Sequence, residues 1–112
     1  MKAEALKGHL DGLLLAVLAP GPRHGYGVIE ALKAASGGRL SLPTGTVYPA
    51  LLRLQRGGLV SSSWSTVSGR QRRTYELTGA GRRALEAERR SWRDFAATIT
   101  PILEGHPCPA TP

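Results

Sequence analysis

A basic run occupies the middle of the chain, where residues 70–73 directly follow the turn signal Ser68-Gly69. Guanidinium groups at the tip of a projecting turn can donate hydrogen bonds to phosphate oxygens or enter the minor groove of DNA. A charge run is often only a solvated surface, but this one lies at a turn, and only Glu76 offsets it between Leu59 and Thr78. The sequence therefore predicts a nucleic-acid contact made by Arg70, Arg72 and Arg73.

A second group of polar side chains opens a predicted helix just before this run. Thr44, Thr46 and Tyr48 follow Pro43, which fits a first helical turn, and apolar residues recur behind them at helical spacing. Hydroxyls and backbone amides at such a start can meet phosphates and base edges. Two interpretations stay open: a recognition helix, or an ordinary capped helix in which a threonine caps and the tyrosine is half buried.

Patterns typical of enzymes and metal sites are missing from the sequence. Gly25-Tyr26-Gly27 lacks the third glycine of a dinucleotide fingerprint, because Glu30 occupies its place. The histidines are scattered, and Cys108 has no second cysteine with which to form a zinc site. We therefore predict no catalytic residue, no metal and no cofactor, and a protein that is not an enzyme.

Composition favours an anionic partner. The chain has 112 residues, enough for one small domain, and carries 15 Lys and Arg against 8 Asp and Glu, a net charge of +7 at pH 7. Asp11 and Pro20 interrupt the first apolar stretch, so we expect neither a signal peptide nor a transmembrane helix. A single cysteine fits a reducing compartment, and the expected location is the cytoplasm.

Hydrophobic periodicity predicts the helices that must position these groups. Apolar spacing indicates one helix from Leu6 to Leu18 and a second over residues 24–35 that runs through Tyr26 and ends at a glycine cap at residues 37–38. A third helix is expected from Pro43 to the next glycine pair. The second and third of these helices would form a helix-turn-helix.

The period then changes to that of strands. Short strands are expected over residues 59–64 and 74–77, joined as a hairpin through the Ser68-Gly69 turn. A last helix is expected over residues 82–99 after Thr78 as N-cap, with Pro101 kinking or ending it.

This element order predicts a fold that is mainly α with a small β-hairpin: a winged helix-turn-helix domain plus a C-terminal dimerisation helix. The expected parts are a DNA-binding domain over residues 1–78, a dimerisation helix over 79–103 and a disordered, proline-rich tail over 104–112. The last helix carries an apolar seam, and the hairpin must already cap the small core, so the seam needs a second copy of the chain. The residues expected at this dimer interface are Leu85, Trp92, Phe95 and Ile99.

The ordered motifs resemble the PadR-like family of transcriptional regulators from about residue 10 to residue 95. The matching segments are residues 22–26 at the start of the second helix, 45–51 in the recognition helix, 69–75 in the wing and 77–81 before the last helix. A single C-terminal helix resembles the short subgroup of the family. The resemblance implies a dimeric repressor of double-stranded operator DNA that is released by a small aromatic or drug-like effector.

Trp92 also resembles, in position, an interfacial tryptophan on which some short members of the family stack a flat ligand. Two roles stay open for it: effector binding between the subunits, or simple packing in the dimer core. The alternative for the whole protein is a winged-helix module for protein or RNA contact, in which the arginines of the hairpin serve another acidic partner.

Overall fold

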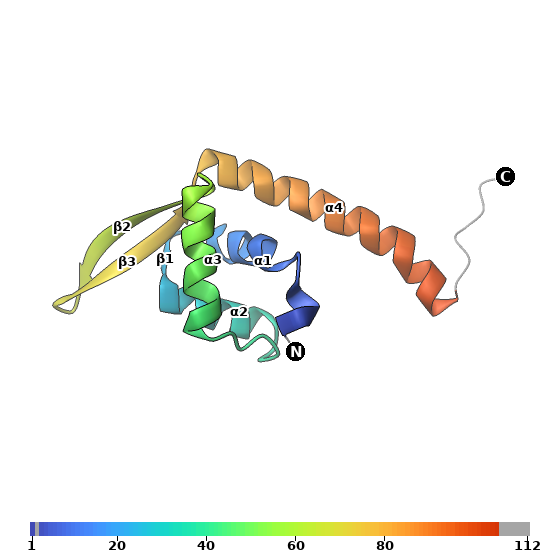
Figure 1. Ribbon diagram of the computed structural model, residues 1–112, viewed down its shortest axis with the longest axis horizontal. Helices are drawn as coiled ribbons and strands as arrows, with labels where there is room; N and C mark the ends of the chain where they lie inside the picture. The colour runs from blue at the N-terminus through green and yellow to red at the C-terminus, as the bar shows by residue number, and fades with distance from the viewer. Residues whose placement is uncertain (2, 106–112) are drawn as a thin grey trace.

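The computed structural model describes residues 1 and 3–105, and Figure 1 shows a small helical body from which a hairpin and a long helix project. The element order is η1-α1-β1-α2-α3-β2-β3-α4, with principal extents of 64 × 29 × 20 Å. The expected fold class, mainly α with a small β-hairpin, is confirmed. Residues 106–112, which hold most of the predicted tail, lie outside the described part of the chain.

The body consists of a short 3-10 helix and three α-helices: η1 (Ala3–Leu6), α1 (Leu10–Leu18), α2 (Gly25–Ala35) and α3 (Thr44–Arg56). The prediction of one continuous helix from Leu6 is wrong, because Gly8 has a left-handed φ of 83° and separates η1 from α1. The predicted glycine cap after α2 is confirmed, with φ of 63° at Gly37 and 87° at Gly38.

The hairpin has two strands, β2 (Val60–Val67) and β3 (Arg70–Leu77), which pair in antiparallel register from Val60 opposite Leu77 to Val67 opposite Arg70. Its strands are longer than predicted and end at a two-residue turn, where Ser68 has φ of 52° and Gly69 of 75°. A third strand, β1 (Arg23–His24), was not predicted. It pairs with β3 on the side away from β2, so the sheet order is β1-β3-β2.

The last helix, α4 (Gly79–Glu104), leaves the sheet directly and extends far beyond the body (Figure 1). The prediction of Thr78 as N-cap is confirmed, because its Oγ1 accepts a hydrogen bond from the Gly81 amide at 3.0 Å. Pro101 does not end the helix, which continues to Glu104 and closes on Gly105 with φ of 72°.

The hydrophobic core lies where the three body helices meet the base of the sheet. Its largest fully buried side chains are Leu14, Leu18, Val28, Val47, Leu51 and Val60. Tyr75 and Leu77 add the inner face of β3, and Leu85 adds the first part of α4. The core therefore fixes the buried side of α3 and the base of the hairpin, which together carry the candidate site.

Candidate nucleic-acid interface

The helix α3 has one buried and one exposed side. The core takes Val47, Ala50, Leu51 and Leu54, and each of these side chains is almost fully covered. The first turn and the opposite side stay open to solvent, and Leu52 and Arg56 continue that open side along the helix. The sequence-based separation of a polar helix start from an apolar anchoring face is therefore present in the folded chain.

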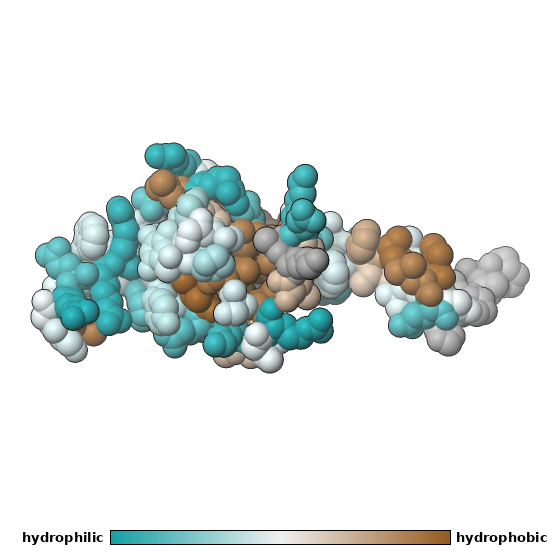
Figure 2. Space-filling view, turned by 60° about the horizontal axis from the view of Figure 1, so that its bottom comes forward, coloured by the Kyte–Doolittle hydropathy of each residue, from teal (hydrophilic) through white to brown (hydrophobic). Residues whose placement is uncertain are grey.

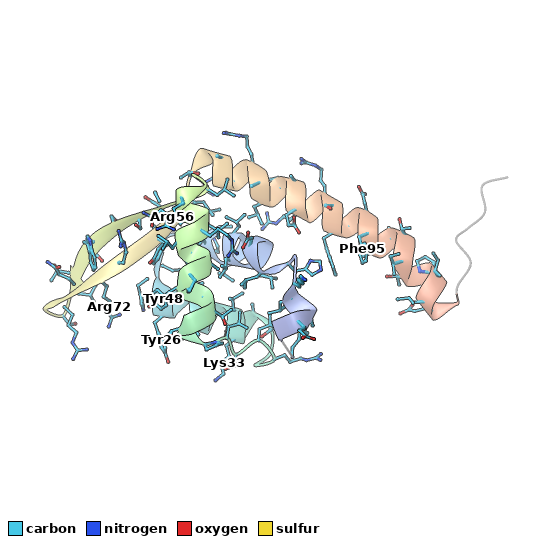
Figure 3. All side chains as sticks on the ribbon, viewed as in Figure 1. Tyr26, Lys33, Tyr48, Arg56, Arg72 and Phe95 are labelled. Atoms are coloured by element: carbon cyan, nitrogen blue, oxygen red, sulfur yellow. The ribbon has the colours of Figure 1, made fainter. Side chains whose placement is uncertain are left out.

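Tyr48 lies at the edge of this open side, with 39% of its surface exposed. Its ring crosses the start of α2, where a Cβ on Gly25 would come within 2.4 Å of Tyr48 Cε1. A glycine is thus required for the tyrosine to lie there. Tyr26 follows in the first turn of α2, as predicted, and is 55% exposed. Figure 3 shows both tyrosines on the same side of the molecule.

The two threonines of α3 occupy different surroundings. Thr44 is exposed in the first turn. Thr46 is half-buried and lines a groove of about 470 Å³ toward α1, together with Asp11 and Arg53, which form an ion pair. Thr46 and Tyr48 therefore lie on two different flanks of α3 and do not form one contact surface.

The arginines of the basic run lie in β3, not in the turn itself, and all three are exposed. Because side chains alternate along a strand, Arg70 and Arg72 lie on one face of the hairpin and Arg73 on the other. Arg72 Nη1 is 3.3 Å from Nε2 of His24. Arginine can only donate, so this histidine nitrogen must accept the hydrogen bond.

His24 and Tyr26 are the surface residues that sequence reasoning missed. His24 belongs to β1, a two-residue strand too short to give a periodicity signal, and Tyr26 lies in the first turn of α2 that follows it. His24 contacts Arg72 and directly precedes Gly25, on which Tyr48 lies, so we treat these residues as one continuous surface that joins the hairpin to α3.

The residues predicted for the dimer interface fall into two groups. Leu85 is only 4% exposed and belongs to the core of its own chain, so the expectation that it lacks a partner there is wrong. Trp92 and Phe95 are 53% and 55% exposed, and Ile99 is half-buried. The helix α4 lies on α1 at Gly12, where a Cβ would come within 2.7 Å of Glu88 Cγ.

Trp92 lies at a groove of about 620 Å³ between α4 and the η1–α1 segment. Its ring centroid is 5.6 Å from that of His9, edge-on, and 5.9 Å from that of Phe95, stacked. The floor of the groove is apolar, with Leu6 and Leu13 among its lining residues. An exposed aromatic pair beside an apolar groove can accept a flat ligand or another apolar surface.

The described residues hold no group of three or more histidine, cysteine, aspartate or glutamate side chains placed to bind a metal. Within the same residues, none of the helices combines the length and the hydrophobicity that crossing a bilayer requires.

A third helix with an open polar start, followed by a basic hairpin, defines the winged helix-turn-helix class of DNA-binding proteins. Residues 14–87 match the family described as the transcriptional regulator PadR-like family, and the chain belongs to this family. The family and its solved members are transcriptional regulators, so the prediction that the protein is not an enzyme is confirmed. The chain is a DNA-binding transcriptional regulator.

Among individual relatives, two solved structures match most of the chain, and a curated relative matches about half of it. A transcriptional regulator of Mycobacterium tuberculosis is 46% identical over 55 residues, which is 49% of this chain and 51% of that protein. A PadR-like transcription factor from Bacteroides fragilis is 33% identical with a TM-score of 0.75, over 89% of this chain and 95% of that one. A PadR family regulator from Clostridium difficile is 28% identical with a TM-score of 0.76, over 86% and 99%.

Proposed function

We propose that this chain is a homodimeric repressor that binds operator DNA through α3 and the hairpin and leaves the DNA when a small aromatic effector binds. The observation that carries the DNA-binding part is the continuous surface from Arg72 through His24 to Tyr48. It places the Arg72 guanidinium beside the His24 imidazole, and the next residue, Gly25, lies under the Tyr48 phenol ring at the start of the third helix. Such a surface can donate hydrogen bonds to several phosphates along one edge of a DNA groove at the same time.

Within this proposal the contact residues have different roles. Thr44 and Tyr48 face the major groove and its phosphates, where a lost base contact costs about 1 to 3 kcal/mol. Arg70 and Arg72 neutralise phosphates from the outer face of the hairpin. Thr46 is half-buried and has the least surface to offer, so Thr44 and Tyr48 carry the reading role at the helix start.

The dimer part of the proposal rests on the far end of α4. Figure 2 shows hydrophobic residues gathered there, beyond the body, and Ile102 and Leu103 are even more exposed than Phe95. A single chain leaves this face in water, whereas a two-fold partner would cover it. Two copies would present two recognition helices to two half-sites of a palindromic operator.

Footprinting across the promoter region next to the protein's own gene tests the DNA-binding proposal. We expect protection of a two-fold symmetric site that the Tyr48→Ala variant no longer protects. Arg90→Ala, on the solvent side of α4, is the matched control and should protect as well as the unmodified chain. Binding to RNA or protein without any protected palindrome would favour the alternative, a winged-helix module for another acidic partner.

The effector part rests on Trp92, whose ring lies open beside the groove. Planar aromatic compounds titrated into a Trp64→Phe variant should quench the remaining Trp92 fluorescence, and the same compounds should weaken operator binding by the unmodified chain. Binding that moves α4 would change the spacing of the two recognition helices. If no compound does both, Trp92 is a packing residue of the interface.

A further inference from the structure

Two neighbouring arginines of the hairpin make entirely different contacts. Arg72 pairs across the hairpin with Ser65 and turns toward His24 on β1. Arg73 pairs with Trp64, and its guanidinium carbon is 5.2 Å from the centroid of that ring, a cation–π distance. Their charges are equal, but Arg72 contacts a side chain of β1, whereas Arg73 contacts side chains of β2.

A network of side-chain contacts leads from Arg73 to the recognition helix. Arg73 Nε donates a hydrogen bond to Ser62 Oγ at 3.1 Å, and Ser62 Oγ donates one to Gln55 Oε1 at 2.9 Å. Gln55 lies in the last turn of α3, and both Gln55 and Ser62 are half-buried. A continuous path of side-chain contacts therefore joins β3, β2 and α3.

The network lies where the sheet becomes narrower. The strand β1 pairs with β3 only at Tyr75 and Thr74, so from Arg73 outward the hairpin is a two-stranded ribbon. An isolated two-stranded ribbon is marginally stable and twists more strongly than a wider sheet. The first residue pair beyond β1 is Trp64 and Arg73, and the contacts through Ser62 and Gln55 hold this pair against α3. These contacts therefore fix the direction in which the rest of the hairpin projects.

We propose that Arg73 is a positioning residue that sets the angle between the wing and the recognition helix through Ser62 and Gln55, while Arg72 is the arginine that contacts phosphate. This inference rests on the proposed DNA-binding function. It assigns Arg73 a role different from the phosphate contact that the sequence predicts, and it makes Gln55, which has no place in the DNA surface, important for DNA affinity.

Salt dependence of operator binding separates the two arginines. Arg72→Ala should lower the slope of log affinity against log salt concentration by about 0.9, the value for one phosphate contact. Arg73→Ala should weaken operator binding by about tenfold, because the variant must order its loosened wing when it binds. The slope should stay unchanged, because the number of phosphate contacts, and with it the number of released counterions, stays the same. An equal fall in slope for both variants would make Arg73 a phosphate contact and overturn the proposal.

A double-mutant cycle tests the path to α3. Gln55→Ala alone should weaken operator binding, and adding it to Arg73→Ala should cause little further loss, because the path is already broken. Adding Gln55→Ala to Arg72→Ala should multiply the two losses, since those residues act separately. If the losses of operator affinity multiply in both double variants, Arg73 and Gln55 do not act through a shared network.

The free protein provides a measurement that needs no DNA. The chain has two tryptophans, so its indole N–H groups give two NMR signals, which a Trp92→Phe sample assigns. In Arg73→Ala and in Gln55→Ala the Trp64 signal should shift and report greater mobility, while in Arg72→Ala it should not. If the unmodified chain binds no operator, the proposed function fails. An unchanged Trp64 signal in Arg73→Ala and in Gln55→Ala would separately overturn the positioning role, whether or not the chain binds operator.

Discussion

At the scale of single residues, burial changes the chemistry of one tyrosine beside the candidate site. Burial raises the pKa of the Tyr75 hydroxyl above its ordinary value of 10.0, the nearby Arg73 charge lowers it, and Tyr48 raises it further. The net pKa is raised, so the folded protein keeps the phenol protonated at a pH where the unfolded chain has begun to ionise. This part of the stability is complete below pH 10 and is lost as the pH rises through the higher folded value.

We predict that Tyr75→Phe reduces the loss of stability on the alkaline side. Urea unfolding at pH 8 and above about pH 10 should show a smaller fall in the free energy of unfolding for the variant than for the unmodified chain. Tyr26→Phe is the control, because Tyr26 is exposed and should leave the alkaline fall unchanged. Equal alkaline losses in the Tyr75→Phe variant and the unmodified chain would contradict the assigned shift.

At the scale of elements, the junction between hairpin and last helix depends on a close approach of two backbones. A Cβ on Gly81, in the first turn of α4, would lie only 2.0 Å from the Leu59 carbonyl oxygen. The neighbouring Thr78 amide donates a hydrogen bond to the same oxygen at 3.1 Å. Because backbone atoms cannot swing away as a flexible side chain can, glycine is required at this position.

We predict that Gly81→Ala lowers the free energy of unfolding by about 1 to 3 kcal/mol, the usual cost of overpacking. Gly79→Ala is a matched control in the same helical turn, where the new Cβ would meet only Arg83 Nη1 at 3.5 Å. There alanine should be neutral or should stabilise by up to about 1 kcal/mol, since it favours helix. If urea denaturation gives the same change in the free energy of unfolding for both variants, the close approach to the Leu59 carbonyl oxygen does not require glycine at position 81.

Sequence patterns predicted the elements well where the signal is local and poorly where it depends on pairing. The turn at residues 68–69 and the cap at Thr78 were both visible as short motifs. The full length of the hairpin was not, because its outer strand residues are mostly polar and exposed and carry no alternation of hydrophobicity. The strand β1 exists only through its pairing with β3, so nothing in its own two residues could reveal it.

At the scale of the whole molecule, the seam of α4 shows what periodicity can and cannot predict. Apolar spacing placed Leu85 and Phe95 on one seam, and the structure confirms that both belong to one long helix. Periodicity gives the apolar face of a helix but not what covers each part of it. The body of the same chain covers Leu85, whereas Phe95 lies on the part of α4 that extends beyond that body (Figure 3).

This difference gives a prediction that separates folding from association. Phe95→Glu should remove dimerisation and leave the helical body folded, because Phe95 is 55% exposed in a single chain and its loss opens no core cavity. Leu85→Ala should instead lower the free energy of unfolding by about 2 to 5 kcal/mol, the cost of a cavity in a packed core, and leave the association of the folded chain intact. Sedimentation combined with circular dichroism over a range of concentrations distinguishes the two effects. If the Phe95→Glu variant sediments as the unmodified chain does, whether both are dimers or both are monomers, the far end of α4 is not the dimer interface. The two half-sites of the proposed operator would then need another source of two-fold symmetry, since a palindrome is matched only by a protein that presents two recognition helices one helical turn of DNA apart.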